Sequence, residues 1–347
     1  MSVARWIAER LEQGTLLPRT LAAPLSTPYA AVSARTVARP ATLPTQTPVI
    51  GIGGAVLGGA GKTPVAIAYA LCLADQGLRV ALVAHGYRAH SSSPRIVTGH
   101  DCVLTVGDDA LVAARALRDR ACVWVGRDRN LTLRAASECA DVIVVDGLLQ
   151  TRPRPLARSV LVLDGTKPFG AGACPPAGDL RGPVDALVSV CDEVVLVTDA
   201  QSSDPPVPRE LHRLARGSIR MARVDLIGVS ERNRRMSLES IASLRLGLLT
   251  TIARPGRIEA SLVARGIRPI CTLHGSDHRS LGRSELRTVR TLAEKDKLDA
   301  WLVTTKCVTH LAAEEVGCRL LVLEVTTRLD PTPQPVLDSP PCVPEDS

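Results

Sequence analysis

The feature that most constrains the fold is a glycine-rich segment that lies between a short apolar run and a helix-forming run. Residues 58–64 have the sequence Gly-Gly-Ala-Gly-Lys-Thr-Pro. They follow the apolar run 48–53 and precede residues 65–74, which are rich in Ala, Leu and Ile. In phosphate-binding loops a strand, a glycine loop ending in Lys-Thr and a helix follow one another in this order. The sequence therefore predicts such a loop.

The residue types in this segment suit the binding of a phosphorylated ligand. Glycines let backbone N–H groups curl around phosphate oxygens, and the following helix N-terminus adds a partial positive charge. Lys62 is expected to act on the terminal phosphates, and the Thr63 hydroxyl is expected to hold Mg²⁺. The residues expected to bind phosphate are Gly58, Gly59, Ala60, Gly61, Lys62 and Thr63. Val56 replaces the first glycine of the usual pattern, and a plain glycine turn before a helix is the alternative.

Length and composition limit the class of protein. A chain of 347 residues can bury a full core and form two lobes. The net charge of +7 fits an anionic ligand or a membrane surface. Aromatic residues make up only 2% of the chain, and this scarcity of stacking side chains argues against a nucleic-acid partner. The 10 cysteines include no Cys-x-x-Cys pair, which argues against a zinc or redox site and favours a reduced, cytoplasmic compartment.

Short apolar runs alternate with helix-forming runs over most of the chain. Over residues 48–200 this alternation predicts an α/β fold like that of P-loop NTPases, a parallel sheet with helices on both faces. A second alternation over 245–329 predicts a smaller α/β lobe, with 201–244 as a linker region and 330–347 as a disordered tail. The expected strands are 79–84, 121–125, 141–145, 160–163, 193–197, 246–252, 269–273, 300–304 and 320–325.

The N-terminal segment, residues 1–47, combines arginines with scattered large apolar side chains. Such a segment is either an amphipathic helix that rests on an acidic membrane surface or an ordinary surface helix that covers the core. No apolar run is long enough for a transmembrane helix, and early charges such as Arg5 and Glu9 interrupt any secretory signal.

Three further features narrow the chemistry. An apolar run ends in Asp146, a carboxylate expected to complete a Mg²⁺ shell, although a turn cap is the alternative. A guanine-reading [NT]-K-x-D motif is absent, which argues against a GTPase. The pairs Asp108-Asp109 and Asp277-His278 could supply a base for a hydroxyl substrate, and helix caps or surface turns are the alternative for each pair. Asp108 is also a plausible N-cap for a helix that begins at Asp109.

Taken in order, these motifs resemble the tetraacyldisaccharide 4′-kinase family of the lipid A pathway. The resemblance runs from about residue 6 to 325, and no single motif beyond the glycine loop is specific. The matching segments are 24–29, 58–64, 85–87, 106–109, 125–129, 146–150, 156–164, 168–170, 176–181, 252–255 and 277–278.

The resemblance implies a kinase that uses ATP and Mg²⁺ to phosphorylate the 4′-hydroxyl of a tetraacylated disaccharide 1-phosphate. It implies that Asp108 is the base near that hydroxyl and that His278 assists it. It also implies that Asp146 belongs to the metal shell with Gln150 nearby, and that Arg181 neutralises phosphate charge. Since an acylated lipid stays in the bilayer, the enzyme is expected to attach peripherally to the cytoplasmic face of the inner membrane.

The chain departs from the family pattern at several acidic positions. Gly147 replaces the second Asp of D-D-G-F-Q, and Gly182 replaces the Glu that follows Arg181. Thr305 and Cys307 replace both acids of V-T-E-K-D. These losses leave open a divergent nucleotide-binding homologue with weak or no kinase activity. A soluble kinase for a small molecule is a third possibility.

Overall fold

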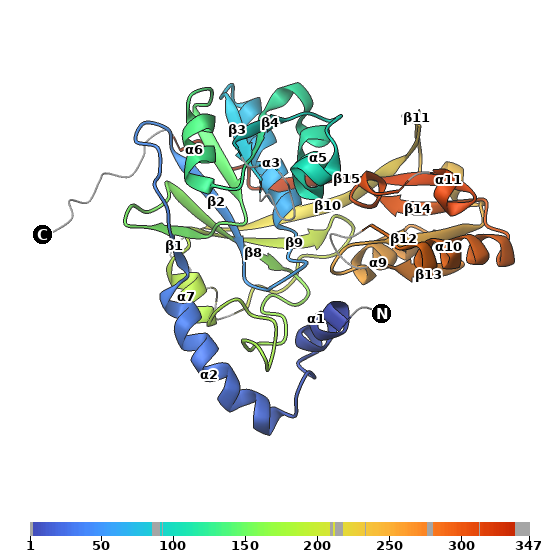
Figure 1. Ribbon diagram of the computed structural model, residues 1–347, viewed down its shortest axis with the longest axis horizontal. Helices are drawn as coiled ribbons and strands as arrows, with labels where there is room; N and C mark the ends of the chain where they lie inside the picture. Colours follow the sequence, from blue (N-terminus) through green and yellow to red (C-terminus); the bar gives the residue numbers. More distant parts are fainter. Residues whose placement is uncertain are drawn as a thin grey trace, which may run out of the picture.

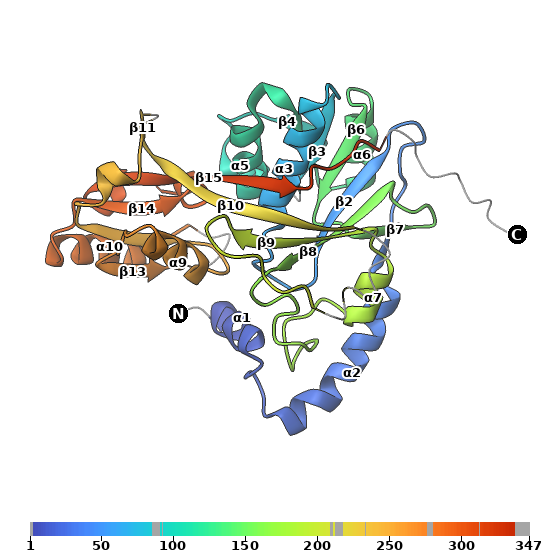
Figure 2. The same ribbon diagram turned by 180° about the vertical axis from the view of Figure 1, so that it is seen from behind.

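The computed structural model describes residues 3–84, 91, 93–208, 211, 218–232, 234–275, 280–311 and 313–336 (Figure 1). Within these residues one sheet of 13 strands runs through both lobes, and Figure 2 shows its other side. Its strand order is β13-β12-β14-β15-β10-β9-β8-β2-β6-β3-β5-β4, with β11 beside β10. The predicted α/β fold with a largely parallel sheet is confirmed.

The central strands of the larger lobe are apolar and buried on both faces, as helices on both sides of a parallel sheet require, whereas the edge strands are partly exposed. Its strands are β2 (Val49–Gly54), β3 (Val80–Val83), β4 (Arg95–Val97), β5 (Cys122–Val125), β6 (Val142–Asp146), β8 (Arg158–Asp164) and β9 (Glu193–Asp199). All neighbours among them pair in parallel except β4 and β5, which are antiparallel.

Helices cover both faces of this half of the sheet. Its helices are α3 (Lys62–Asp75), α4 (Val103–Val106), α5 (Asp108–Leu117), α6 (Arg129–Ser137) and α7 (Val184–Ser189). Apolar residues of α3 and α5 share one core cluster with one face of the strands, whereas α6 and α7 pack in clusters on the other face. Small Ala side chains and branched Val and Leu fill these layers, which fits the low aromatic content.

The smaller lobe repeats this plan. Its strands are β12 (Leu246–Thr250), β13 (Cys271–His274), β14 (Ala300–Thr304) and the first part of β15 (Arg319–Asp330). Helix α9 (Gly256–Ala264) packs on one face, and α10 (Arg283–Lys295) and α11 (Ala313–Val316) pack on the other.

The stretch 201–244, expected as a linker, contains the long strand that joins the two lobes. Strand β10 (Ser218–Glu231) pairs in parallel with β9 along its first half and, on its other edge, antiparallel with β15 along most of its length. The short β11 (Arg234–Met236) folds back on its end. The strand was not predicted because the preceding residues, up to Pro208, are rich in Ser, Asp and Pro and are typical of a linker. The apolar and β-branched residues typical of a strand begin only at Ser218.

The first and the last described segments both contact the larger lobe. Helices α1 (Val3–Gln13) and α2 (Arg19–Arg35) lie below the sheet in Figure 1, and β1 (Ala38–Pro40) pairs with β7 (Gln150–Arg152). The tail was expected to be disordered from residue 330, but residues 331–336 are described and their carbonyls accept hydrogen bonds. Proline lacks a donor N–H yet keeps its acceptor, so Pro331 and Pro333 accept from Arg220 and Gln76.

A buried polar triad ties α3 to the sheet. The Tyr69 hydroxyl of α3 donates to the Glu193 carboxylate at the start of β9. Arg220 of β10 donates to the same carboxylate from Nε at 2.7 Å and from its Nη2 at 3.2 Å. The side chains of Arg220 and Glu193 are only 6% and 4% exposed. Burial, followed by the charge of Glu193, raises the pKa of Tyr69 far above its usual range.

Candidate functional site

The glycine loop joins the carboxyl end of β2 to the first residue of α3, as predicted. Gly59 and Gly61 have φ values of +70° and +85°, the left-handed region in which a side chain would be strained. Gly61 is also the N-cap of α3. The loop therefore presents a turn of backbone and a helix N-terminus at one edge of the sheet, where backbone N–H groups can receive an anion.

Asp146 lies beside this loop because β6 and β2 are parallel neighbours and end at the same edge. The Thr63 hydroxyl donates to Oδ2 of Asp146 at 2.6 Å. Asp146 is 4% exposed, and among the described residues its Oδ1 has no hydrogen-bond partner. An unsatisfied buried carboxylate oxygen next to a hydroxyl fits a Mg²⁺ ion, which takes one or two protein oxygens and completes its shell with water and phosphate.

The charges at the loop are poised for an anionic ligand. Burial, followed by the charge of Arg181, lowers the pKa of the Lys62 ammonium. Burial, followed by the charge of Asp109, raises the pKa of the Asp146 carboxyl. Each group is held where its charged form is disfavoured. A phosphate beside Lys62 and a cation beside Asp146 would relieve both effects.

The acidic pair at the start of α5 faces a lysine of the smaller lobe. Nζ of Lys306 lies 3.5 Å from Oδ2 of Asp108 and 3.3 Å from Oδ1 of Asp109. Nε2 of His310 lies 3.9 Å from Oδ2 of Asp108. The charge of Asp109 also acts on Lys62, so the acidic pair belongs to the surroundings of the loop. His278 and the segment 85–87 lie outside the described residues.

Asp108 does not cap α5 as expected. The helix begins at Asp108 itself and Gly107 is the N-cap, with φ of +85°. Asp108 is 5% exposed, and its Oδ1 accepts a hydrogen bond from the backbone N–H of Asp109 at 2.9 Å. The left-handed glycine turns the chain so that the carboxylate is buried next to Lys306.

Arg181 is in contact with the glycine loop, but through the loop's carbonyl groups. Its Nε donates to the carbonyl of Val56 at 2.9 Å and its Nη2 to that of Leu57 at 3.3 Å. Its own backbone N–H donates to the carbonyl of Ala55 at 2.7 Å. Arg181 therefore stabilises the first half of the loop, residues 55–57, through hydrogen bonds to its carbonyl groups.

Gln150 is not brought to the loop. Its side-chain amide donates to Ser159 at 2.7 Å and to the carbonyl of Val190, both near the amino ends of strands, whereas the loop lies at a carboxyl end. The chain after Asp146 doubles back over β2, and a Cβ at Gly51 would lie 2.8 Å from the carbonyl oxygen of Leu148. This close return carries Gln150 along β2, away from Thr63.

The sequence interpretation missed three residues of this region. Lys306 was seen only as part of a motif that had lost its acids, and His310 was not considered. Arg254 was noted only within the family pattern. The position of Lys306 just after the carboxyl end of β14 was the available signal, because ligand-facing residues of parallel sheets follow strands at that edge.

The sheet, the glycine loop, Thr63 and Asp146 together define a phosphate-loop protein with nucleotide-binding architecture. A family model described as tetraacyldisaccharide-1-P 4′-kinase matches residues 18–339. The chain belongs to this family, which confirms the resemblance seen in its motifs.

Individual relatives agree with this assignment. A tetraacyldisaccharide 4′-kinase of Anaeromyxobacter sp. (strain K) is 34% identical over 273 residues, 75% of this chain and 71% of the relative. One of Phenylobacterium zucineum (strain HLK1) is 30% identical over 313 residues, 88% of each chain. The crystal structure of LpxK from Aquifex aeolicus in complex with ATP has the same fold, with a TM-score of 0.66 at 19% identity over 90% of this chain and 95% of that one.

Proposed function

We propose that the protein transfers the γ-phosphoryl group of ATP to the 4′-hydroxyl of tetraacyldisaccharide 1-phosphate, giving the 1,4′-bisphosphate. Family membership supports the reaction. The observation that carries the site assignment is the hydrogen bond from Thr63 to the buried Asp146, whose other carboxylate oxygen is unsatisfied among the described residues, beside a glycine loop and an acidic pair. These are the parts that phosphoryl transfer needs: a phosphate cradle, metal ligands and a base.

In this mechanism the loop amides and Lys62 bind the phosphates. Thr63 and Asp146 would hold Mg²⁺, which neutralises phosphate charge when bound. Asp108 accepts the proton of the 4′-hydroxyl while the oxygen of that hydroxyl bonds to the γ-phosphorus. The bond from that phosphorus to the β–γ bridging oxygen breaks, and ADP leaves. Lys306 holds the Asp108 carboxylate in place, and Arg181 holds the loop.

A phosphorylation assay tests this proposal. Purified protein, Mg-ATP and tetraacyldisaccharide 1-phosphate in detergent micelles should yield a product with one added phosphate. Lys62→Met serves as the control because it removes the ammonium but keeps an apolar stem. If the wild-type protein forms no more product than this control, the divergent homologue without turnover is the correct reading.

We further propose that α2 contacts the cytoplasmic face of the inner membrane. None of the helices in the described part of the chain combines the length and the apolar character that spanning a bilayer demands. However, α2 carries four large apolar side chains at helical spacing, each 38% to 60% exposed: Leu21, Leu25, Tyr29 and Val32. The helix projects below the sheet in both views (Figures 1 and 2). Such a stripe suits the boundary between headgroups and acyl chains.

Vesicle binding tests this contact. The double variant Leu21→Ser with Leu25→Ser should sediment less with anionic phospholipid vesicles than the wild type. Leu104→Ser with Leu131→Ser removes two leucines of comparable exposure elsewhere on the surface and is the matched control. Equal loss in both double variants would reject α2 as the membrane contact.

A further inference from the structure

We propose that Arg254 is a positioning residue for the phosphate-binding loop: from the smaller lobe it holds the loop in its binding conformation. This inference rests on the proposed nucleotide-binding role of the loop. Arg254 lies two residues before α9, and its side chain is only 11% exposed. A nearly buried arginine at the boundary between two lobes needs partners for its charge, and the partners it has point to the loop.

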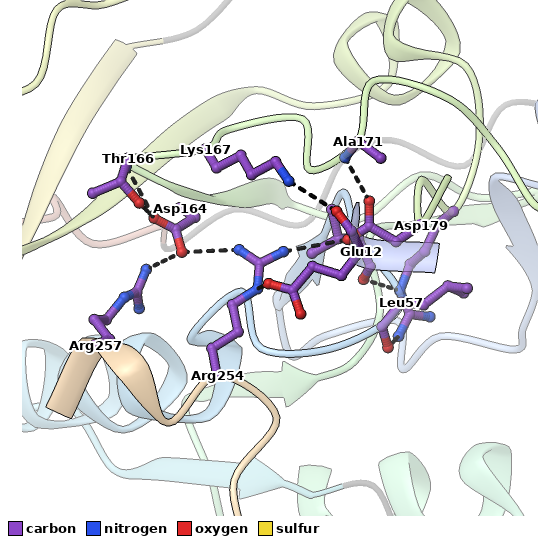
Figure 3. Close-up of polar contacts among 11 residues, drawn as sticks. Glu12, Leu57, Asp164, Thr166, Lys167, Ala171, Asp179, Arg254 and Arg257 are labelled. Atoms are coloured by element: carbon purple, nitrogen blue, oxygen red, sulfur yellow. Dashed lines mark hydrogen bonds and ion pairs between the residues drawn. The ribbon is translucent and has the colours of Figure 1, made fainter. Parts of the chain in front are cut away.

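The guanidinium group of Arg254 is bound by carboxylates from three separate segments. Nη1 lies 2.9 Å from Oδ2 of Asp164 at the end of β8, and Nη2 lies 3.3 Å from Oδ2 of Asp179. Nε lies 3.1 Å from Oε1 of Glu12 in α1 (Figure 3). Three carboxylates around one planar guanidinium fix both its position and its orientation.

The carboxylates are themselves held in place. Oδ1 of Asp164 accepts from the backbone N–H and the hydroxyl of Thr166 at 2.9 and 2.7 Å, while its Oδ2 lies 2.6 Å from Arg257 (Figure 3). Burial alone would raise the pKa of Asp164, but the charge of Arg257 and the Thr166 bonds outweigh it and hold the pKa well below its usual range. Oδ1 of Asp179 accepts from Ala171 at 2.8 Å.

Two contacts connect this cluster to the loop. The carbonyl of Asp179 accepts a hydrogen bond from the backbone N–H of Leu57, a loop residue, at 2.9 Å. The aliphatic stem of Arg254 lies against Gly59, where an added Cβ would be 2.6 Å from Cγ and 2.9 Å from Cδ. The loop turn at Gly59 is thus supported by Arg254 on one side and through Asp179 at Leu57.

Arg265, near the other end of α9, provides a matched comparison. It is 6% exposed and also crosses between secondary-structure elements, with Nη1 3.5 Å from Asp199 and Nη2 2.6 Å from Asp225. Its other side-chain hydrogen bonds are to Ser261 in its own helix. Both arginines anchor α9, but the contacts of Arg265 are with β9, β10 and α9, and those of Arg254 reach the loop.

Calorimetric titration with Mg-ATP, together with thermal melting, separates these roles. Arg254→Met, which keeps much of the stem, should weaken ATP binding about tenfold, or ~1.4 kcal/mol, because ordering of the loop would then oppose binding. Arg265→Met should lower the melting temperature to a similar degree and leave the ATP Kd within about twofold of wild type. At saturating ATP, Arg254→Met should keep most of its kcat, so the loss appears in KM for ATP.

The possible results decide clearly. Equal increases of the ATP Kd in both variants would mean that Arg254 only anchors α9. An unchanged Kd in Arg254→Met would also overturn the inference. Either result would leave the proposed kinase function intact. Failure of the wild-type protein to bind Mg-ATP would overturn both. If Arg254→Met does not fold, Arg254→Lys replaces it: its single ammonium cannot contact three carboxylates, so a Kd increase smaller than tenfold but above that of Arg265→Lys is expected.

Discussion

Removing Arg220 from the buried triad should destabilise the protein strongly, because Glu193 would remain as a buried charge. Glu193 is 4% exposed and accepts three hydrogen bonds: two come from Arg220 and one from the Tyr69 hydroxyl. Arg220→Met keeps a long, unbranched side chain but deletes two of these bonds and the only positive charge that the triad contains. Breaking a buried ion pair on one side costs about 3–5 kcal/mol.

The double variant Arg220→Met with Glu193→Leu should be less damaging than Arg220→Met alone. With both charges gone, no carboxylate remains buried without a partner, and an apolar pair of similar volume often has nearly the same stability as an ion pair. We therefore expect the double variant to recover at least about 2 kcal/mol of the loss. The Tyr69 hydroxyl would then lose its acceptor, which limits the recovery.

Urea unfolding, monitored by circular dichroism and by tryptophan fluorescence, measures the loss of stability in the single and in the double variant. Trp124 lies in the larger lobe and Trp301 in the smaller, so coincident transitions would justify a single unfolding free energy for both lobes. A cost below about 1 kcal/mol for Arg220→Met, or a double variant less stable than the single one, would refute the assignment of a buried, mutually compensated charge pair.

Three further predictions concern the site. Asp108→Ala should lower kcat by about 10²–10⁴ with little change in ATP affinity, as expected for loss of a general base, and unchanged turnover would remove it from that role. Lys306→Met should lower kcat by about tenfold or more at constant ATP Kd, since it deletes the ammonium that holds the base. Steady-state kinetics measure kcat and calorimetry measures the Kd; weaker ATP binding with an unchanged kcat would contradict this role. Asp164→Asn should flatten the acid side of the stability profile: the pKa of Asp164 is depressed in the folded state, so its contribution is complete above roughly pH 4 and is lost as pH falls below that value. Urea midpoints at neutral and acidic pH test this, and equal acid-side slopes in wild type and variant would contradict it.

The sequence predicted those parts of the fold in which local pattern and burial agree. Strands such as Val142–Asp146 and Ala300–Thr304 are continuous apolar runs between turns, and both are observed where they were expected. The glycine loop and Asp146 followed from the same logic, since parallel neighbours end at one edge. The single sheet through both lobes was not predicted, because Ser218–Glu231 reads as irregular until its partner Arg319–Asp330 is placed beside it.

Side-chain roles were harder to predict than strands, because they depend on long-range contacts. Gln150 lies only four residues from Asp146, yet the chain reverses between them and the two side chains face opposite ends of the sheet. Conversely, Lys306 and Asp108 are far apart in sequence and meet only across the two lobes. Spacing in a sequence carries no information about such reversals or meetings, and the sequence therefore recovered the loop better than its surroundings.

The junction between the lobes has a mechanical consequence. Over Asp225–Gly228, β10 no longer pairs with β9, and the facing residues 324–326 of β15 no longer pair with β14. Among the described residues the sheet is therefore only two strands wide at this point. The register shifts between Leu226 and Gly228, so the ladder of hydrogen bonds is locally disrupted in this narrow part of the sheet. A movement of one lobe against the other would deform the sheet where it is only two strands wide, and it would change the distances from Lys306 to Asp108 and Asp109.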